Sequence, residues 1–203
     1  MSVIVETNTL NLMGNLLKRQ ELMELIKEKG LILPDHPITL SSGEKSNYYY
    51  DLKMVMADST GASLIGELLY DIIEREFAAK SVGGLEMGAI PISTAVIVKS
   101  FERRKYLGMR QFIVRKKAKM HGSEKKVEGY LIDPVVIVDD VMTKGNSVVQ
   151  AIDAVRNAGY NVAGVVLVID REDPMNFIKD KIKYFSLFNH SDFKEFIEIH
   201  SNK

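Results

Sequence analysis

The sequence predicts an α/β fold in which a mainly parallel, twisted sheet is flanked by helices and carries a small N-terminal hood. From about residue 60 onward, apolar runs rich in β-branched residues alternate with segments of helical periodicity. The predicted strands at residues 135–140 and 162–170 contain the longest of these runs, as expected of parallel strands covered on both faces. The length of 203 residues suits a single domain with one substantial core.

Residues 1–56, which we call the hood, depart from this alternation. Leucine, methionine and isoleucine recur at helical spacing over residues 12–29, and Gly30 is a favourable residue to end that helix. Residues 38–56 contain two β-type runs around a Ser-Gly-Glu-Lys turn, which predicts a hairpin on the main sheet. We therefore expect one domain over residues 1–203, with the hood as its N-terminal segment.

Helices and strands alternate through the rest of the chain. The expected helices cover residues 60–79, 91–104 and 145–158, and a terminal helix is capped by Ser191. The remaining strands are expected at residues 81–88, 109–114 and 184–188, the first of them ending in a glycine loop at residues 84–88. A polar stretch at residues 115–129 separates two of these strands.

Composition excludes several classes of function. Lysine plus arginine and aspartate plus glutamate balance at 27 each, so the chain lacks the basic excess of a nucleic-acid-coating protein. The absence of cysteine excludes disulfides, thiolate metal sites and cysteine nucleophiles. No apolar run approaches the ~20 residues that span a bilayer, and no secretory leader is visible. We expect a cytoplasmic protein with neither nucleic acid nor membrane as a partner.

Residues 135–147, VVIVDDVMTKGNS, form the most informative segment. Asp139 and Asp140 follow an apolar strand, and carboxylates only accept hydrogen bonds, which suits the two hydroxyls of a ribose. Residues 143–147, the phosphate loop, offer backbone N–H groups, hydroxyls and a helix N-terminus that favour a phosphate. Gly145 permits the left-handed dihedral angles of such a loop. The pattern therefore predicts a ribose 5-phosphate site at the carboxyl end of a strand.

An alternative is a pair of solvated or Mg²⁺-binding aspartates, as in a nucleotide hydrolase. That alternative requires a phosphate loop of the form G-x-x-x-x-G-K-[ST], which this chain lacks. The four histidines have no ligand-like spacing, so no metal site made of protein side chains is expected.

The same segment resembles the phosphoribosyl diphosphate (PRPP) signature of type I phosphoribosyltransferases. The resemblance implies that fold, and it implies that Asp139 and Asp140 bind the ribose hydroxyls while the phosphate loop binds the 5-phosphate. The PRPP-binding residues that it implies here are Asp139, Asp140, Val141, Met142, Thr143, Lys144, Gly145, Asn146 and Ser147.

Residues 115–122, RKKAKMHG, begin a basic stretch whose ordinary interpretation is a solvated surface loop or, less often, a nucleic-acid patch. The order of these residues resembles the mobile catalytic loop of orotate phosphoribosyltransferases. The resemblance implies diphosphate contacts from Arg115, Lys116, Lys119 and His121, with Arg115, Lys119 and His121 as the catalytic residues. In that family the loop reaches the site of the neighbouring subunit, so a homodimer with shared active sites is also implied.

Two further segments resemble the orotate-using members. Ser42 and Gly43 with Ser46 and residues 48–51 are similar to an N-terminal block whose aromatic side chains lie near the base. Arg171, after an apolar strand, resembles the arginine that meets the carboxylate of orotate, and its planar fork suits a carboxylate. The implied orotate-binding residues are Thr143 and Arg171. The alternative for Arg171 is an ordinary ion pair at a strand end.

The implied activity is transfer of the 5-phosphoribosyl group from Mg²⁺-bound PRPP to orotate in pyrimidine synthesis. The alternatives are a phosphoribosyltransferase for another base, such as a purine, and a PRPP-sensing regulator on the same fold. Two positions depart from the family pattern: Ser41 replaces a frequent lysine, and the glycine loop at residues 84–88 lacks the lysine often found there. The backbone N–H groups of that loop are one alternative source of charge neutralisation for the diphosphate.

Overall fold

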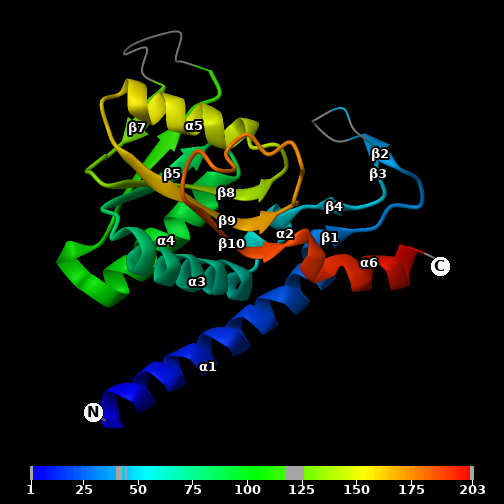
Figure 1. Cartoon of the computed structure of the whole chain (residues 1–203), viewed down its shortest axis with the longest axis horizontal. Helices are drawn as coiled ribbons and strands as arrows, with labels where there is room; N and C mark the ends of the chain where they lie inside the picture. Colours follow the sequence, from blue (N-terminus) through cyan, green and yellow to red (C-terminus); the bar gives the residue numbers. More distant parts are fainter. Residues whose placement is uncertain (1, 40–42, 44, 118–125, 202–203) are drawn as a thin grey trace.

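A six-stranded sheet forms the centre of the computed structural model, which describes residues 2–39, 43, 45–117 and 126–201 (Figure 1). The strand order is β10-β9-β8-β5-β6-β7. The strands are β5 (Ser81–Leu85), β6 (Arg110–Val114), β7 (Val127–Gly129), β8 (Val135–Met142), β9 (Val162–Asp170) and β10 (Tyr184–Asn189). Neighbouring strands are parallel except for β6 and β7. The structure confirms the predicted mainly parallel sheet.

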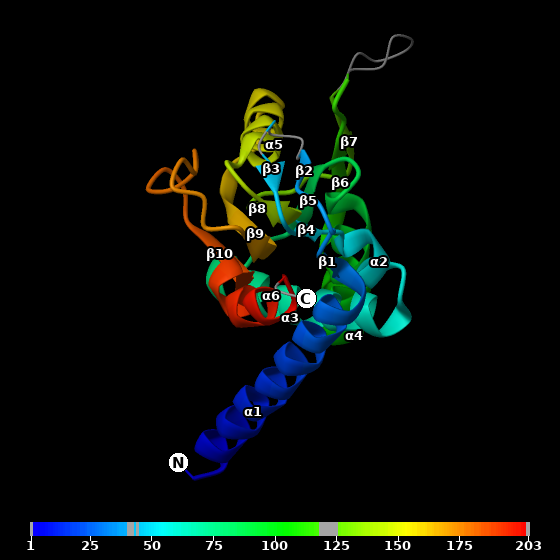
Figure 2. The ribbon, with the colours of Figure 1, turned by 90° about the vertical axis from the view of Figure 1, so that its right-hand side faces the viewer.

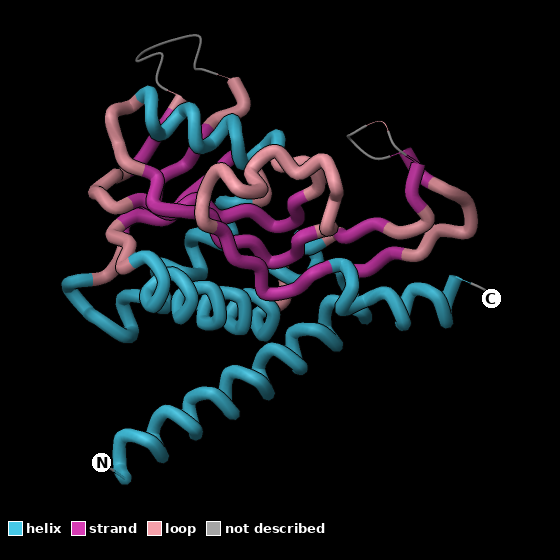
Figure 3. The backbone as a smooth tube through the Cα atoms, in the orientation of Figure 1, coloured by secondary structure: helices cyan, strands magenta, loops and turns pink. Residues whose placement is uncertain are grey.

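Alternate residues of β8 face two different helical layers. Val136 and Val138 belong to the core cluster built with α3 (Ser59–Phe77) and α4 (Ala89–Arg104). Val135 and Ile137 belong to the cluster built with α5 (Asn146–Asn157). Figures 1 and 3 show α5 on one side of the sheet and α3 and α4 on the other. Because successive strand side chains point to opposite faces, a continuous apolar run buries both faces at once.

The hood begins with α1 (Ser2–Leu25), which continues into a π-helical turn, η1 (Ile26–Gly30). The predicted start of this helix at residue 12 is therefore wrong by ten residues. Figure 2 shows the N-terminal part of α1 projecting away from the layers of the domain. Gly30 ends the helix without adopting a left-handed conformation. An added Cβ there would lie 2.8 Å from Cγ2 of Val55, so a glycine at this position allows the two segments to pack closely. No helix among the described residues is long and apolar enough to cross a membrane.

The predicted hairpin is half correct. Strands β2 (Ile38–Thr39) and β3 (Lys45–Ser46) pair antiparallel, but in a small sheet of their own rather than on the main sheet. The second run divides: β4 (Tyr49–Tyr50) pairs with β1 (Leu31–Ile32), and the remainder forms α2 (Leu52–Met56). The division occurs because the Asp51 carboxylate accepts a hydrogen bond from the backbone N–H of Lys53 and caps the helix.

Two other expectations need correction. The polar stretch contains β7, which pairs with β6 and was not predicted. The terminal helix is capped by Asn189, whose backbone N–H donates to Asp192, and not by Ser191. It begins as a 3₁₀ turn, η3 (His190–Phe193), and continues as α6 (Lys194–Ser201).

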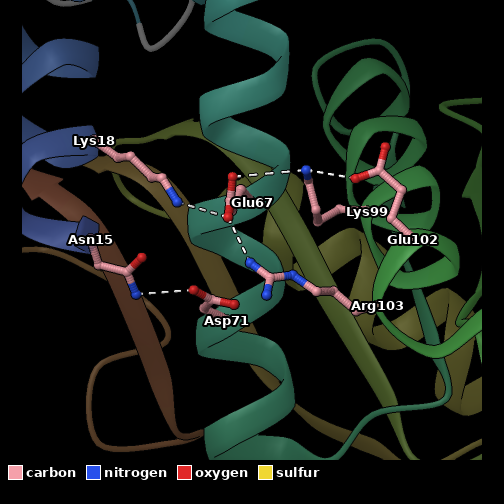
Figure 4. A network of polar contacts seen from close by, with 7 residues as sticks. All are labelled: Asn15, Lys18, Glu67, Asp71, Lys99, Glu102 and Arg103. Atoms are coloured by element: carbon pink, nitrogen blue, oxygen red, sulfur yellow. Dashed lines mark hydrogen bonds and ion pairs between the residues drawn. The ribbon is translucent and has the colours of Figure 1, made fainter. Parts of the chain in front are cut away.

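A polar network centred on Glu67 attaches α1 to the rest of the domain (Figure 4). The Glu67 carboxylate contacts Nζ of Lys18 on α1 at 2.8 Å and Nη2 of Arg103 on α4 at 2.7 Å. Burial opposes ionisation, but the hydrogen bond from Lys18 and the neighbouring cations outweigh it, so the pKa of Glu67 lies below its usual value. Asn15 adds a hydrogen bond from α1 to Asp71. One largely buried carboxylate on α3 therefore joins three helices.

Candidate active site

The sheet has a topological switch point between β5 and β8. From β5 the chain moves to β6 on one side and later returns to β8 on the other side. In open α/β sheets the loops at such a point leave a crevice at the carboxyl ends of the strands. Here that crevice is a cavity of about 390 Å³. Its walls are residues 85–88 after β5, Lys116 after β6, the end of β8 and residues of the hood.

A second hollow of about 220 Å³ adjoins the first and is enclosed by the phosphate loop. It is lined by Asp139, Val141, Met142, Thr143, Lys144, Gly145, Asn146 and Ser147. Gly145 has φ +87°, the left-handed conformation expected from the sequence, and it directly precedes α5. Asp139, Val141, Thr143 and Ser147 also line the larger cavity. The two hollows therefore share one wall.

Asp139 lines both hollows and Asp140 lines only the larger one, and we call these two residues the floor of the larger cavity. Asp139 is only 7% exposed, and burial together with the neighbouring charge of Asp140 raises its pKa well above the usual value. The Asp140 carboxylate accepts a hydrogen bond from the backbone N–H of Val141 at 2.8 Å. Gly88 approaches so closely that an added Cβ would lie 2.7 Å from Oδ1 of Asp140. A hydroxyl donor or a cation bound here would stabilise the ionised form of Asp139.

The glycine loop contacts the start of the basic stretch. The Glu86 carboxylate accepts a hydrogen bond from the backbone N–H of Lys116 at 2.8 Å, and both residues line the larger cavity. The peptide bond between Glu86 and Met87 is cis. Arg115 precedes Lys116 in the chain, and its guanidinium pairs with Glu128 at 3.3 Å. The carboxyl ends of β5 and β6 are thus joined by a side-chain bond.

Arg171 follows β9 and is held by two residues of the hood. Its Nη2 donates to the hydroxyl of Ser46 at 3.4 Å, and its Cζ lies 4.5 Å from the centroid of the Tyr48 ring. Tyr48 stacks on His190 with ring centroids 4.5 Å apart, and the Tyr50 hydroxyl lies 3.0 Å from Nδ1 of His190. Among the described residues Arg171 forms no ion pair, so the strand-end ion pair considered above is not found there. Arg171 and Thr143 are both among the residues that line the larger cavity.

The comparisons with known proteins agree with this geometry. Residues 58–199 match the family described as "Phosphoribosyl transferase domain", which is more than half of the chain. An orotate phosphoribosyltransferase from Aquifex aeolicus (strain VF5) is 39% identical over 183 residues, and the match covers 87% of this chain and 98% of the relative. The chain belongs to the orotate phosphoribosyltransferase family.

Solved structures of orotate phosphoribosyltransferases share the fold. One from Mycobacterium tuberculosis H37Rv, in complex with Fe(III) dicitrate, is 32% identical with a TM-score of 0.71, and the match covers 86% of this chain and 98% of that chain. The same enzyme in complex with PRPP is 26% identical with a TM-score of 0.65, covering 86% and 90% of the two chains. Family membership confirms the resemblance and the fold that the motifs predicted, and it makes this chain a pentosyltransferase.

Most of the residues predicted for the orotate phosphoribosyltransferase site meet in the two hollows. These are Lys116, Asp139, Asp140, Val141, Met142, Thr143, Lys144, Gly145, Asn146, Ser147 and Arg171. Arg115 is not among the residues that line either hollow, and its guanidinium pairs with Glu128. Lys119 and His121 lie outside the described residues.

Sequence reasoning did not find Lys53, which also lines the larger cavity. The sequence predicted a strand over this segment, and a strand gave no reason to place the Lys53 side chain in the site. The available signal was Asp51 as a helix cap, followed by apolar Leu52 and Val55 at helical spacing.

Proposed function

We propose that this chain transfers the 5-phosphoribosyl group from PRPP to orotate, giving orotidine 5'-monophosphate and diphosphate in de novo pyrimidine (UMP) synthesis. The observation that carries the proposal is the position of Arg171. Arg171 lines the cavity that also contains Asp139 and Asp140, and no carboxylate among the described residues pairs with its guanidinium. A carboxylate on the substrate base would provide the bidentate partner that the planar fork of arginine suits.

The two hollows suggest how PRPP lies in the site. Its 5-phosphate occupies the smaller hollow, where the phosphate loop and the N-terminus of α5 offer N–H donors. Its ribose hydroxyls donate to Asp139, on the wall that the two hollows share, and to Asp140 in the larger hollow. The diphosphate then extends toward residues 86–88 and Lys116, and orotate lies against Thr143 and Arg171.

In the proposed reaction the bond between ribose C1 and the diphosphate oxygen breaks, and diphosphate leaves with the electron pair. A ring nitrogen of orotate forms the new bond to C1. The chain contributes by aligning the two substrates and by stabilising the departing negative charge. We assign diphosphate contacts to Arg115, Lys116, Lys119 and His121, with Arg115, Lys119 and His121 as the catalytic residues.

Mg²⁺ fits this site as an ion that arrives with PRPP. No group of three potential protein ligands is found among the described residues. The donor set consists of Asp139 and Asp140, and a hard cation with few protein ligands takes its remaining oxygen ligands from phosphates and water. Bound to the diphosphate, Mg²⁺ would withdraw negative charge from the leaving group.

We further propose a single domain over residues 1–203, a cytoplasmic location and a homodimer in which the basic stretch completes the partner's site. Four exposed apolar side chains on α4 and the turn that follows it support the dimer. Val98 and Phe101 on α4 are 54% and 58% exposed, and Tyr106 and Leu107 in the 3₁₀ turn η2 (Lys105–Leu107) are 91% and 80% exposed. Exposed apolar side chains on adjoining elements are typical of protein interfaces.

The experiment is to mix purified protein with PRPP and Mg²⁺ and to follow the loss of orotate absorbance. Hypoxanthine, guanine, adenine and uracil are tested in parallel. Conversion of orotate alone, dependent on Mg²⁺, is the expected result. Conversion of a different base would overturn the role of Arg171, and PRPP binding without conversion of any base would favour a regulator.

A further inference from the structure

The diphosphate end of the larger cavity presents an electrostatic problem. The glycine loop contributes Glu86, whose carboxylate is engaged with the backbone N–H of Lys116, and the floor contributes Asp139 and Asp140. A diphosphate brought into this region adds several negative charges to three carboxyl groups. Unless cations face it, this like-charge repulsion disfavours binding.

Three cationic side chains of the described chain line that cavity: Lys53, Lys116 and Arg171. Arg171 is held against Tyr48 and Ser46 on the side assigned to the base. Lys116 lies on the side of β6, next to the glycine loop. Lys53 approaches from the hood and has no assigned role.

The packing of α2 directs Lys53 into the cavity. Leu52 and Val55 are 1% and 0% exposed, so one face of this short helix is fully buried. That face lies against two glycines: an added Cβ on Gly30 would be 2.8 Å from Cγ2 of Val55, and one on Gly61 would be 2.2 Å from the carbonyl oxygen of Val55. The side chain of Lys53 therefore points away from the core, and 58% of it is exposed.

Asp51 holds the Lys53 ammonium at the cavity. Oδ1 of Asp51 accepts hydrogen bonds from both the backbone N–H and Nζ of Lys53, each at 3.2 Å. Burial lowers the pKa of Lys53. The hydrogen bond to Asp51 and the acidic groups of Tyr49, Asp51 and Asp140 raise this pKa by a larger amount, so the net change is upward. The Lys53 ammonium therefore stays protonated, and Lys53 and Asp140 both line the larger cavity.

We propose that Lys53 binds the diphosphate group of PRPP from the hood side of the cavity, opposite Lys116, and replaces the cation that the glycine loop lacks. This inference rests on the proposed function, because it assumes that PRPP is the substrate. The ammonium would exchange part of its contact with Asp51 for phosphoryl oxygens, and it would stabilise the diphosphate as the C1–O bond breaks. Lys53 would thus link the fold of the hood to departure of the leaving group.

The test compares ligands with and without the diphosphate group. PRPP, inorganic diphosphate and ribose 5-phosphate are titrated calorimetrically, with Mg²⁺, into wild type, Lys53→Met and Lys53→Arg. Loss of one charge-assisted hydrogen bond predicts that Lys53→Met binds PRPP and diphosphate roughly ten- to a hundredfold more weakly. Ribose 5-phosphate binding should be unchanged, and Lys53→Arg should retain most of the affinity.

Lys80→Met is the matched control. Lys80 is an exposed lysine that precedes β5 at the end of the strand opposite to the cavity, and its substitution should change none of the three affinities. Equal binding of diphosphate by wild type and Lys53→Met would overturn the inference. So would an equal loss for ribose 5-phosphate, because that result would indicate a general distortion of the site.

Failure of this inference can be distinguished from failure of the proposed function. None of the titrations contains orotate. If wild type binds PRPP but converts no orotate, the proposed function fails, and the Lys53 variants still decide the inference. If wild type converts orotate and Lys53→Met binds diphosphate normally, the inference alone fails.

Discussion

The backbone N–H of Lys116 donates a hydrogen bond to the side chain of Glu86 at 2.8 Å, which joins the loop after β5 to the segment after β6. Removing the acceptor in Glu86→Ala should loosen one wall of the cavity and raise the KM for PRPP several-fold. Glu86→Gln keeps an oxygen acceptor and should have a smaller effect. Steady-state kinetics with PRPP as the varied substrate measures both, and an unchanged KM in Glu86→Ala would show that this bond does not shape the site.

Arg171→Ala should lower kcat/KM for orotate by at least about a hundredfold, because a buried substrate carboxylate would lose its charged partner. PRPP affinity should be retained, since Arg171 lies on the side assigned to the base. Arg171→Lys preserves the charge without the planar fork and should be intermediate. Undiminished orotate turnover in Arg171→Ala would rule out orotate recognition by this residue.

Gly145 and Gly159 form a natural pair for testing the phosphate loop. Both have φ +87°, and an alanine Cβ would meet no atom closer than 3.5 Å at Gly145 and none within 4 Å at Gly159. Each substitution to alanine should cost about 1–2 kcal/mol of stability through the left-handed dihedral angle. Only Gly145→Ala should weaken ribose 5-phosphate binding, because its backbone lines the smaller hollow. Urea unfolding and calorimetry separate the two effects, and equal phosphate binding by both variants would contradict the assignment.

His190 makes stability dependent on pH. Burial and the nearby Arg171 guanidinium lower its pKa, so the folded state favours the neutral ring, and Tyr48, Tyr50, Glu172 and Lys194 complete its surroundings. A histidine with a lowered folded pKa binds more protons when unfolded, so its contribution is fully present above about pH 6.5 and is lost as the pH falls.

His190→Gln should therefore reduce the decline in unfolding free energy between pH 7.5 and 5.5, relative to wild type. Urea titrations at the two pH values provide the measurement. His36→Gln, at an exposed histidine, should keep the full decline. A decline of the same size in His190→Gln would mean that other groups produce it.

The parts of the site that lie on one continuous segment were predictable. The apolar run of β8, the two aspartates and Gly145 lie together in the sequence, and a strand that ends in a glycine-containing loop positions them by itself. The left-handed conformation of Gly145 followed from the same local chemistry.

The parts that depend on distant contacts were not predictable. Strand β7 exists through pairing with β6, in which Val127 lies opposite Val114, and its own sequence is short and polar. Helix α2 follows three tyrosines that favour a strand, and its formation depends on the Asp51 cap and on burial of Val55 against Gly61. Lys53 was missed for that reason.

Near the C-terminus, Asn189 and Ser191 are both acceptable caps, and the hydrogen bond between Asn189 and Asp192 selects Asn189.

The wall that Asp139 provides to both hollows has a consequence for inhibitor design. Two small fragments, one in the phosphate loop and one in the larger cavity, would be separated only by the side chains that both hollows share. A short linker that passes over Asp139 would convert the second binding event into an intramolecular one and raise its effective concentration. Linked compounds of this kind should gain affinity over their separate halves without any new protein contact.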